Sequence, residues 1–183
     1  MRFNARLPLA AATALLSIFP ALAAAQASVD AVWVPRHVSF VYQGFTTHYS
    51  CDGLREKIRE MLSKLGALDL RIREFGCTRL GVEAFPGVRV TMRVLVPASS
   101  AHDHEAGSVI AARWRNVVLL ASNASPQEQG NCELIEQFKE TFLPLFATRH
   151  INYQSNCMPH QLTLGTHLSA EVLMPDTMPI QRR

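Results

Sequence analysis

Two stretches of the chain carry apolar residues at helical spacing, and each stretch begins at a cysteine. The first apolar set follows Cys51 and consists of Leu54, Ile58, Met61, Leu62 and Leu65. The second set follows Cys132 and consists of Ile135, Phe138, Phe142, Leu143 and Phe146. Each set lies along one face of a helix, and four of the five positions share the same offset from their cysteine. The pattern therefore predicts two amphipathic helices of similar design.

The residues around each cysteine favour the start of a helix. An N-cap residue and an acidic residue flank both cysteines, in the segments Ser50-Cys51-Asp52 and Asn131-Cys132-Glu133. Gly66 is a natural C-cap for the first helix. Pro144 should kink the second helix or end it early, because proline cannot donate the helical hydrogen bond.

Alternating apolar and polar residues predict strands around both helices. In the first half the strands are expected at residues 38–42, 68–73 and 88–97, and in the second half at residues 117–121, 150–154 and up to 175. Both halves end in a Val-Leu-x-Pro phrase, and Trp33 and Trp114 stand just upstream of the opening strands. Each half therefore has the predicted order β-α-β-β.

The matched order indicates an internal duplication of residues 33–97 and 114–175, joined by a surface linker at 98–113. The predicted fold is a single α+β domain over residues 26–183, with a frayed tail at 176–183. It is a two-layer sandwich in which two helices cover one face of a mostly antiparallel sheet, and a pseudo-two-fold axis relates the βαββ repeats. A ferredoxin-like arrangement with added strands is the alternative layout.

The four cysteines predict two disulfides. A chain that runs out along a helix and back along a strand returns to the same edge of the sheet. This favours the pairs Cys51–Cys77 and Cys132–Cys157, although the sequence leaves the two pairings between the halves open.

The N-terminus predicts export. Arg2 and Arg6 precede an apolar run at 7–22, and Ala23-Ala24-Ala25 forms a small-residue cleavage site, which together are typical of a signal peptide over residues 1–25. Its removal lowers the formal charge from +3 to +1, because the segment contains two basic and no acidic residues. A near-neutral, disulfide-bonded chain predicts a periplasmic or secreted protein that does not bind nucleic acid.

A basic surface is the main candidate binding site. If the strands at 68–73 and 88–97 pair as a hairpin, four arginines share the face away from the helices: Arg71, Arg73, Arg89 and Arg93. Guanidinium groups bind carboxylate and phosphate well, so this face suits an anionic protein, glycan or lipid head group. The alternative is a solvated face whose arginines pair with acids such as Asp69 and Glu83.

The corresponding face of the second half is expected to be polar and nearly uncharged, with His150, Asn152, Gln154, His167, Ser169 and Glu171. Aromatic residues around the first opening strand suggest a glycan platform, and strand alternation is expected to divide Phe40 and Tyr42 between core and surface. The other aromatic residues there are Phe45 and Tyr49.

Two further functional classes remain as alternatives. His102 and His104, flanked by carboxylates, suggest a copper or zinc site, to which Met158 and His160 would add ligands. An enzyme is the other alternative, although the chain contains no phosphate-binding loop, nucleophile elbow or zinc-protease motif and no cofactor is predicted. The favoured function is a non-catalytic binding or assembly module, with strand addition at the sheet edges as a route to a homodimer.

Overall fold

The computed structural model describes residues 28–77, 85–101, 108–161 and 164–177, and contains one six-stranded antiparallel sheet. The strands are β1 (Val29–Val41), β2 (Leu68–Phe75), β3 (Gly87–Pro97), β4 (Ile110–Leu120), β5 (Thr148–Gln154) and β6 (His167–Pro175). Their order in the sheet is β2-β3-β1-β4-β6-β5. The helices are α1 (Cys51–Lys64), the single turn α2 (Pro126–Gln129) and α3 (Cys132–Thr141). The predicted α+β sandwich with a mostly antiparallel sheet and two main helices is confirmed.

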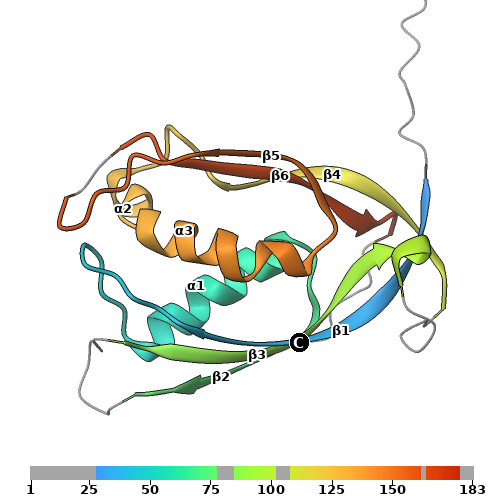
Figure 1. Cartoon of the computed structure of the whole chain (residues 1–183), viewed down its shortest axis with the longest axis horizontal. Coiled ribbons are helices and arrows are strands. Elements are labelled where there is room, and N and C mark those ends of the chain that lie inside the picture. The colour runs from blue at the N-terminus through green and yellow to red at the C-terminus, as the bar shows by residue number, and fades with distance from the viewer. Residues whose placement is uncertain (1–27, 78–84, 102–107, 162–163, 178–183) are drawn as a thin grey trace, which may run out of the picture.

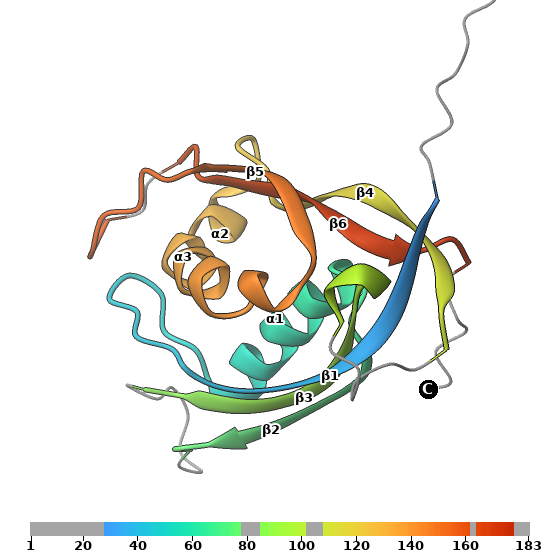
Figure 2. The same ribbon diagram turned by 45° about the vertical axis from the view of Figure 1, so that its right-hand side comes forward.

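The sheet bends around the helices. Strands β1 and β4 pair only from Val29↔Ala112 to Ala31↔Ile110. Beyond this short seam the two three-stranded halves diverge, and α1 and α3 lie between them (Figures 1 and 2). The main core joins both helices to the inner face of all six strands. We call the opposite side of the sheet, which carries Arg71, Arg73 and Arg89 in the first half, the outer face.

Both helices begin at their cysteines, as predicted. Ser50 caps α1 by accepting a hydrogen bond from the Gly53 N–H at 3.1 Å, and Gly66 has the positive φ of +81° expected after a helix end. Helix α3 is shorter, because Pro144 lies in a 3₁₀ turn that follows Thr141. Asn131 occupies the N-cap position of α3 as predicted, but its side chain makes no capping hydrogen bond to the helix.

The disulfides join Cys51 to Cys77 and Cys132 to Cys157, with Cα–Cα distances of 6.1 and 5.7 Å. Each bridge therefore ties the start of a helix to the end of the strand that follows it, and the predicted pairing within each half is confirmed.

Strands β1 and β4 are much longer than the sequence pattern predicts, and Trp33 and Trp114 lie inside them rather than upstream. The reason is a second apolar cluster on the outer face beside the β1–β4 seam. It contains Ala31, Leu95, Ala112 and Leu173, with both tryptophans packed against it. Residues on both faces are buried there, so the alternation that marks a strand disappears. Leu95, which lies on the same face of β3 as Arg89 and Arg93, is only 3% exposed for the same reason.

Regular structure and contacts involve the described ends of the predicted linker and the described start of the predicted tail. Residues Ala98–Ser100 form a 3₁₀ turn, and β4 already begins at Ile110. After β6, the Asp176 N–H donates to the Ala111 carbonyl at 3.1 Å, and the Asp176 carboxylate pairs with Arg113 at 2.7 Å. The chain is thus held beyond the last strand.

Candidate functional site

All four predicted arginines lie on the outer face, where β2 and β3 pair. Arg73 stands directly opposite Arg89, and Arg71 stands opposite Thr91. Arg93 is opposite Leu68, next to a bulge at which Asp69 has a φ of +51°. All four side chains are exposed. The hairpin predicted from the sequence therefore brings the arginines together.

Their partners divide the arginines into two groups. Arg93 donates to the Asp69 carboxylate at 2.7 Å and lies 6.0 Å from the centre of the Trp33 ring. Arg89 lies 4.7 Å above the Phe75 ring. Among the described residues, Arg71, Arg73 and Arg89 have no carboxylate partner; Glu83 lies outside them. The alternative, in which the arginines pair with nearby acids, therefore applies to Arg93, which pairs with Asp69.

Two guanidinium groups directly opposite each other destabilise a strand pair by mutual repulsion. Stacking on Phe75 accommodates the charge of Arg89, because an aromatic ring attracts a cation to its face. Arg71 and Arg73, on the edge strand, remain turned to solvent. The outer face of the first half thus concentrates positive charge in a way that packing does not require.

The outer face of the second half provides a comparison within the same molecule. Asn152 pairs with Ser169 across β5 and β6, and Gln154 pairs with His167, as Arg71 pairs with Thr91 and Arg73 with Arg89. The same framework therefore carries polar residues other than arginine at these positions, as the sequence predicted.

The expectation of a nearly uncharged second face is nevertheless incomplete, because Arg149 also lies there. Its Nε donates to Glu171 at 2.5 Å, its guanidinium stacks 4.5 Å from the Trp114 ring, and His150 Nδ1 lies 3.2 Å from Glu171. Hydrogen bonds from Arg149 and then His150 lower the pKa of the Glu171 carboxyl. Arg149 was missed because β5, like β2, contains a bulge that moves this residue onto the outer face.

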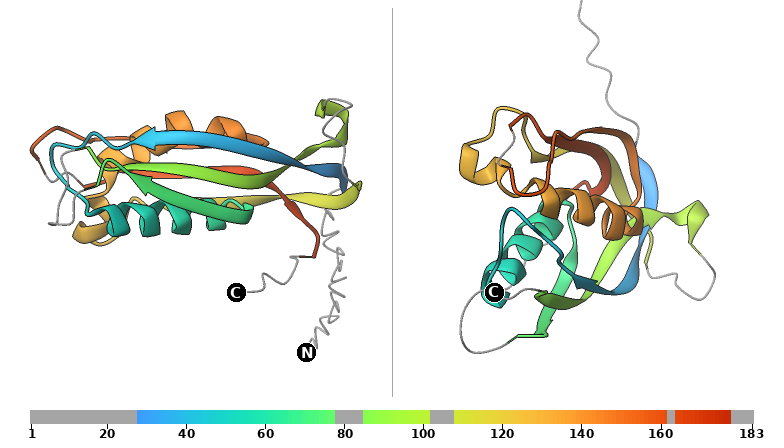
Figure 3. Two further views of the ribbon diagram at one scale, coloured as in Figure 1. Left: turned by 90° about the horizontal axis from the view of Figure 1, so that it is seen from below. Right: turned by 60° about the vertical axis from the view of Figure 1, so that its left-hand side comes forward.

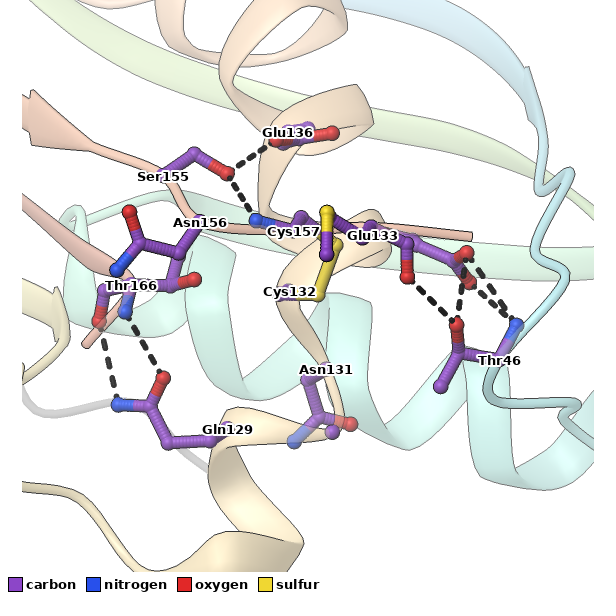
Figure 4. The surroundings of a disulfide bond; sticks show 12 residues. Thr46, Gln129, Asn131, Cys132, Glu133, Glu136, Ser155, Asn156, Cys157 and Thr166 are labelled. Carbon is purple, nitrogen blue, oxygen red and sulfur yellow. Dashed lines mark hydrogen bonds between the residues drawn. A yellow bond between two sulfur atoms is a disulfide. The ribbon is translucent and has the colours of Figure 1, made fainter. Parts of the chain in front are cut away.

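A second notable site lies at the end of the molecule where β1 leads into α1, next to the Cys132–Cys157 bridge. Glu133, only 7% exposed, accepts hydrogen bonds from the backbone N–H groups of Phe45 and Thr46, both at 2.9 Å, and from the Thr46 hydroxyl at 3.1 Å (Figure 4). The Tyr42 hydroxyl lies 3.4 Å from the same carboxylate. One carboxylate in the second half therefore holds residues 42–46 of the first half in place.

Further hydrogen bonds fix the same end. The Gln43 backbone and the Gln137 side chain exchange two bonds of 3.0 and 2.8 Å. Gln129, fully buried, bonds both backbone groups of Thr166, and Ser155 bridges Glu136 and the Cys157 N–H (Figure 4). We call the segments 42–49, 155–161 and 164–166, together with Phe85, the loop end.

The aromatic residues of this region do not form a platform. Phe40, Tyr42 and Tyr49 are 4%, 1% and 8% exposed, whereas Phe45 is 58% exposed. Phe40 and Tyr42 are two positions apart and face the same side, so the expectation that they divide between core and surface is wrong. Burial, followed by the charge of Glu133, raises the pKa of the Tyr49 hydroxyl above its ordinary range.

The predicted metal site stays a prediction. His102 and His104 lie outside the described residues, and the described ranges contain no cluster of three or more His, Cys, Asp or Glu suited to a metal ion. His160 packs its ring 5.6 Å from Phe45, while His167 hydrogen bonds with Ser169 at 3.0 Å.

Comparisons with protein-family models, with curated proteins and with solved structures found no match for this chain. No helix in the described part of the chain is both long and apolar enough to span a bilayer.

Proposed function

We propose that this chain is an exported, non-catalytic binding module whose outer face contacts an anionic partner through Arg71, Arg73 and Arg89. The observation that carries the proposal is the direct opposition of Arg73 and Arg89 without a carboxylate partner among the described residues. A partner with carboxylate or phosphate groups would relieve this repulsion and accept bidentate hydrogen bonds. Arg93, already bound to Asp69, would flank the contact rather than form it.

The comparison between the halves supports this assignment. Asn152, Gln154 and His167 occupy the positions in the second half that correspond to Arg71, Arg73 and Arg89. A polar side chain other than arginine is therefore compatible with the strand framework at each position. Because folding does not need the arginines, binding is the better explanation for them.

The signal-peptide pattern and the two disulfides support export to the periplasm or beyond, since disulfides persist in oxidising compartments.

The test is retention on an immobilised anionic polysaccharide, heparin, at low ionic strength. We expect the variant Arg71→Asn/Arg73→Gln, which copies the residues of the second half, to elute at clearly lower salt than the unchanged protein. Fewer cation–anion contacts release fewer counterions, so the salt dependence should also become shallower. Thermal unfolding should change little, because exposed polar substitutions rarely alter stability by more than about 0.5 kcal/mol.

The matched control is Lys57→Gln/Arg59→Gln on α1, which removes the same charge from exposed side chains that already pair with acids. Equal loss of retention in both double variants would mean that net charge alone governs binding, and the arginine face would then have no special role.

We further propose that the two halves arose by duplication of one βαββ unit, although their sequences have diverged. Several equivalences support it: the mirrored strand order, a cysteine at the start of each helix, and buried apolar residues at the same helix offsets. The bulges match as well, since Asp69 and His150 both lie 18 residues after the cysteine that starts the helix of their half and have φ values of +51° and +49°. Experimental coordinates in which residues 29–97 fail to superimpose on residues 110–175 would overturn this origin.

A further inference from the structure

Exposed apolar side chains gather at one end of the molecule. Five large hydrophobic residues lie there, each between 39% and 62% exposed: Val41, Phe45, Phe85, Met158 and Leu164. They come from the end of β1 and the β1–α1 connection, from the residues just before β3, and from the connection between β5 and β6. The views place these segments at the same end (Figures 1 and 3). Scattered exposed hydrophobics are normal in proteins, whereas a group of them marks a contact surface.

Short contacts confirm that these segments are neighbours. The rings of Phe45 and His160 lie 5.6 Å apart, and the Thr46 hydroxyl reaches the Met158 carbonyl at 3.5 Å. On the other side, the Tyr42 N–H donates to the Pro86 carbonyl at 3.0 Å. The apolar residues therefore form the tips of adjoining segments rather than separate exposed spots.

The exposure of Phe45 is fixed by the structure around it. Glu133 binds the backbone N–H groups of Phe45 and Thr46, and the Tyr42 side chain fills the space beside Gly44, where an added Cβ would lie 1.9 Å from the Tyr42 hydroxyl oxygen. A rigid segment that presents an aromatic side chain to solvent is preorganised for a partner, because its ordering cost is met before binding.

Positive charge borders the same end. Arg73 and Arg89 are each two residues from the end of their strand at the loop end, a distance of about 7 Å along the strand. The exposed Asp52 and the half-buried Glu74 are both paired with Arg55, and Glu128 is hydrogen bonded by Ser125. Apolar tips lie a short distance in front of two cations that have no carboxylate partner among the described residues. This arrangement matches the layers of an anionic lipid surface, where acyl chains lie beneath charged head groups.

We propose that the loop end docks on the surface of an anionic phospholipid bilayer, with Phe45, Met158 and Leu164 entering the interface and Arg73 and Arg89 contacting lipid phosphates. The inference rests on the proposed function, since it identifies the anionic partner. It describes attachment to one face of a bilayer, without a spanning segment.

The experiment is co-sedimentation of the protein lacking residues 1–25 with vesicles of phosphatidylcholine, with and without phosphatidylglycerol. Binding is expected only with phosphatidylglycerol. Phe45→Ser should weaken it by about tenfold, the effect of removing one buried aromatic side chain. Arg73→Gln should weaken it by about fivefold, as expected for one basic residue at an anionic surface. Val109→Ser is the matched control, because Val109 is also 58% exposed but precedes β4 at the other end.

A fluorescent reporter tests the orientation. The native Trp33 lies eight residues from Val41 along β1, about 26 Å from the loop end. Phe45→Trp should therefore add emission that shifts to the blue on binding and is quenched by brominated phosphatidylglycerol. The protein with only its native tryptophans should show neither change.

The outcomes separate this inference from the proposed function. If heparin retention depends on Arg71 and Arg73 but vesicles are not bound, or are bound equally by Phe45→Ser, the lipid assignment is wrong and the anionic-partner proposal stands. Loss of vesicle binding in Val109→Ser equal to that in Phe45→Ser would also contradict insertion of the loop end. If neither heparin nor vesicles respond to the arginine substitutions, both proposals fall.

Discussion

Glu133 stabilises the start of its own helix and also binds backbone groups of the other half of the molecule. Its position in the first turn of α3 suits a carboxylate, because the helix N-terminus carries partial positive charge. The same carboxylate accepts hydrogen bonds from Phe45 and Thr46, 88 and 87 residues away in the sequence. The sequence identifies the first role from the Asn-Cys-Glu segment, whereas the second depends on how the halves pack and leaves no local signal.

We predict that Glu133→Gln destabilises the protein by about 1.5–3 kcal/mol, the usual contribution of hydrogen bonds to a buried charged group. Backbone N–H groups of Phe45 and Thr46 donate to the two carboxylate oxygens, so the amide NH₂ of glutamine would face a donor instead of serving as an acceptor. Urea unfolding monitored by circular dichroism measures the change.

Glu140→Gln on the same helix is the control for Glu133→Gln, since Glu140 is exposed and its substitution should cost less than about 0.5 kcal/mol. Equal destabilisation by the two substitutions would show that the contacts of Glu133 with the first half contribute nothing measurable.

At the scale of the elements, equivalent strand pairs carry ion pairs of opposite polarity. In the first half the acid Asp69 lies on the edge strand and Arg93 on the inner strand. In the second half Arg149 and His150 lie on the edge strand and Glu171 on the inner strand. Both halves therefore keep the attraction between the two strands, but the acidic and basic residues have exchanged strands. Divergence of a shared strand framework would produce this exchange.

This exchange predicts the result of a double-mutant cycle. Arg93→Glu alone should destabilise the protein, because two carboxylates would then face each other at the β2 bulge. Asp69→His added to Arg93→Glu reproduces the arrangement of His150 and Glu171, and should recover about 0.5 kcal/mol below pH 6, where the imidazole is charged. Thermal unfolding at pH 5.5 and 8 measures the coupling, and equal stability of the single and double variants at pH 5.5 would contradict it.

The elements themselves were largely predictable where one face is buried and the other exposed. Both helix starts, the early end of α3 at Pro144 and the alternation of β2 and β3 follow from local patterns, and they were enough to place the four arginines on one face. The first half of β1 was not predictable, because Ala31, Val32 and Val34 are buried on opposite faces and no alternation remains. The bulge that exposes Arg149 depends on pairing between strands, which local periodicity does not encode.

At the scale of the whole molecule, the two halves are joined less by strand pairing in the sheet than by the helices and the core that the sheet encloses. The β1–β4 seam is short, so the contacts between α3 and residues 42–49 and the shared core carry much of the connection between the halves. Three tyrosines take part in this inner packing, and they are the only tyrosines of the chain: Tyr42, Tyr49 and Tyr153. Their hydroxyls bond to the Thr47 carbonyl, Asn131 and Glu136, respectively.

These tyrosines predict cooperative unfolding in alkali. Burial, followed by nearby charges that include Glu133, raises the pKa of Tyr42 and Tyr49, and burial together with Glu136 raises that of Tyr153 to about 12. Above the ordinary value of 10.0 the unfolded chain therefore releases protons that the folded protein retains, so stability falls as the pH rises. Tyrosinate absorbance at 295 nm should appear together with the loss of the far-ultraviolet circular dichroism signal, rather than near pH 10 in the folded state.

Tyr153→Phe should reduce the dependence of the unfolding free energy on pH by about one third, since two of three such groups remain. Three tyrosines that ionised at their ordinary pKa in a fully folded protein would mean that the hydroxyls are open to solvent and that the packing between the halves is looser than the structure requires.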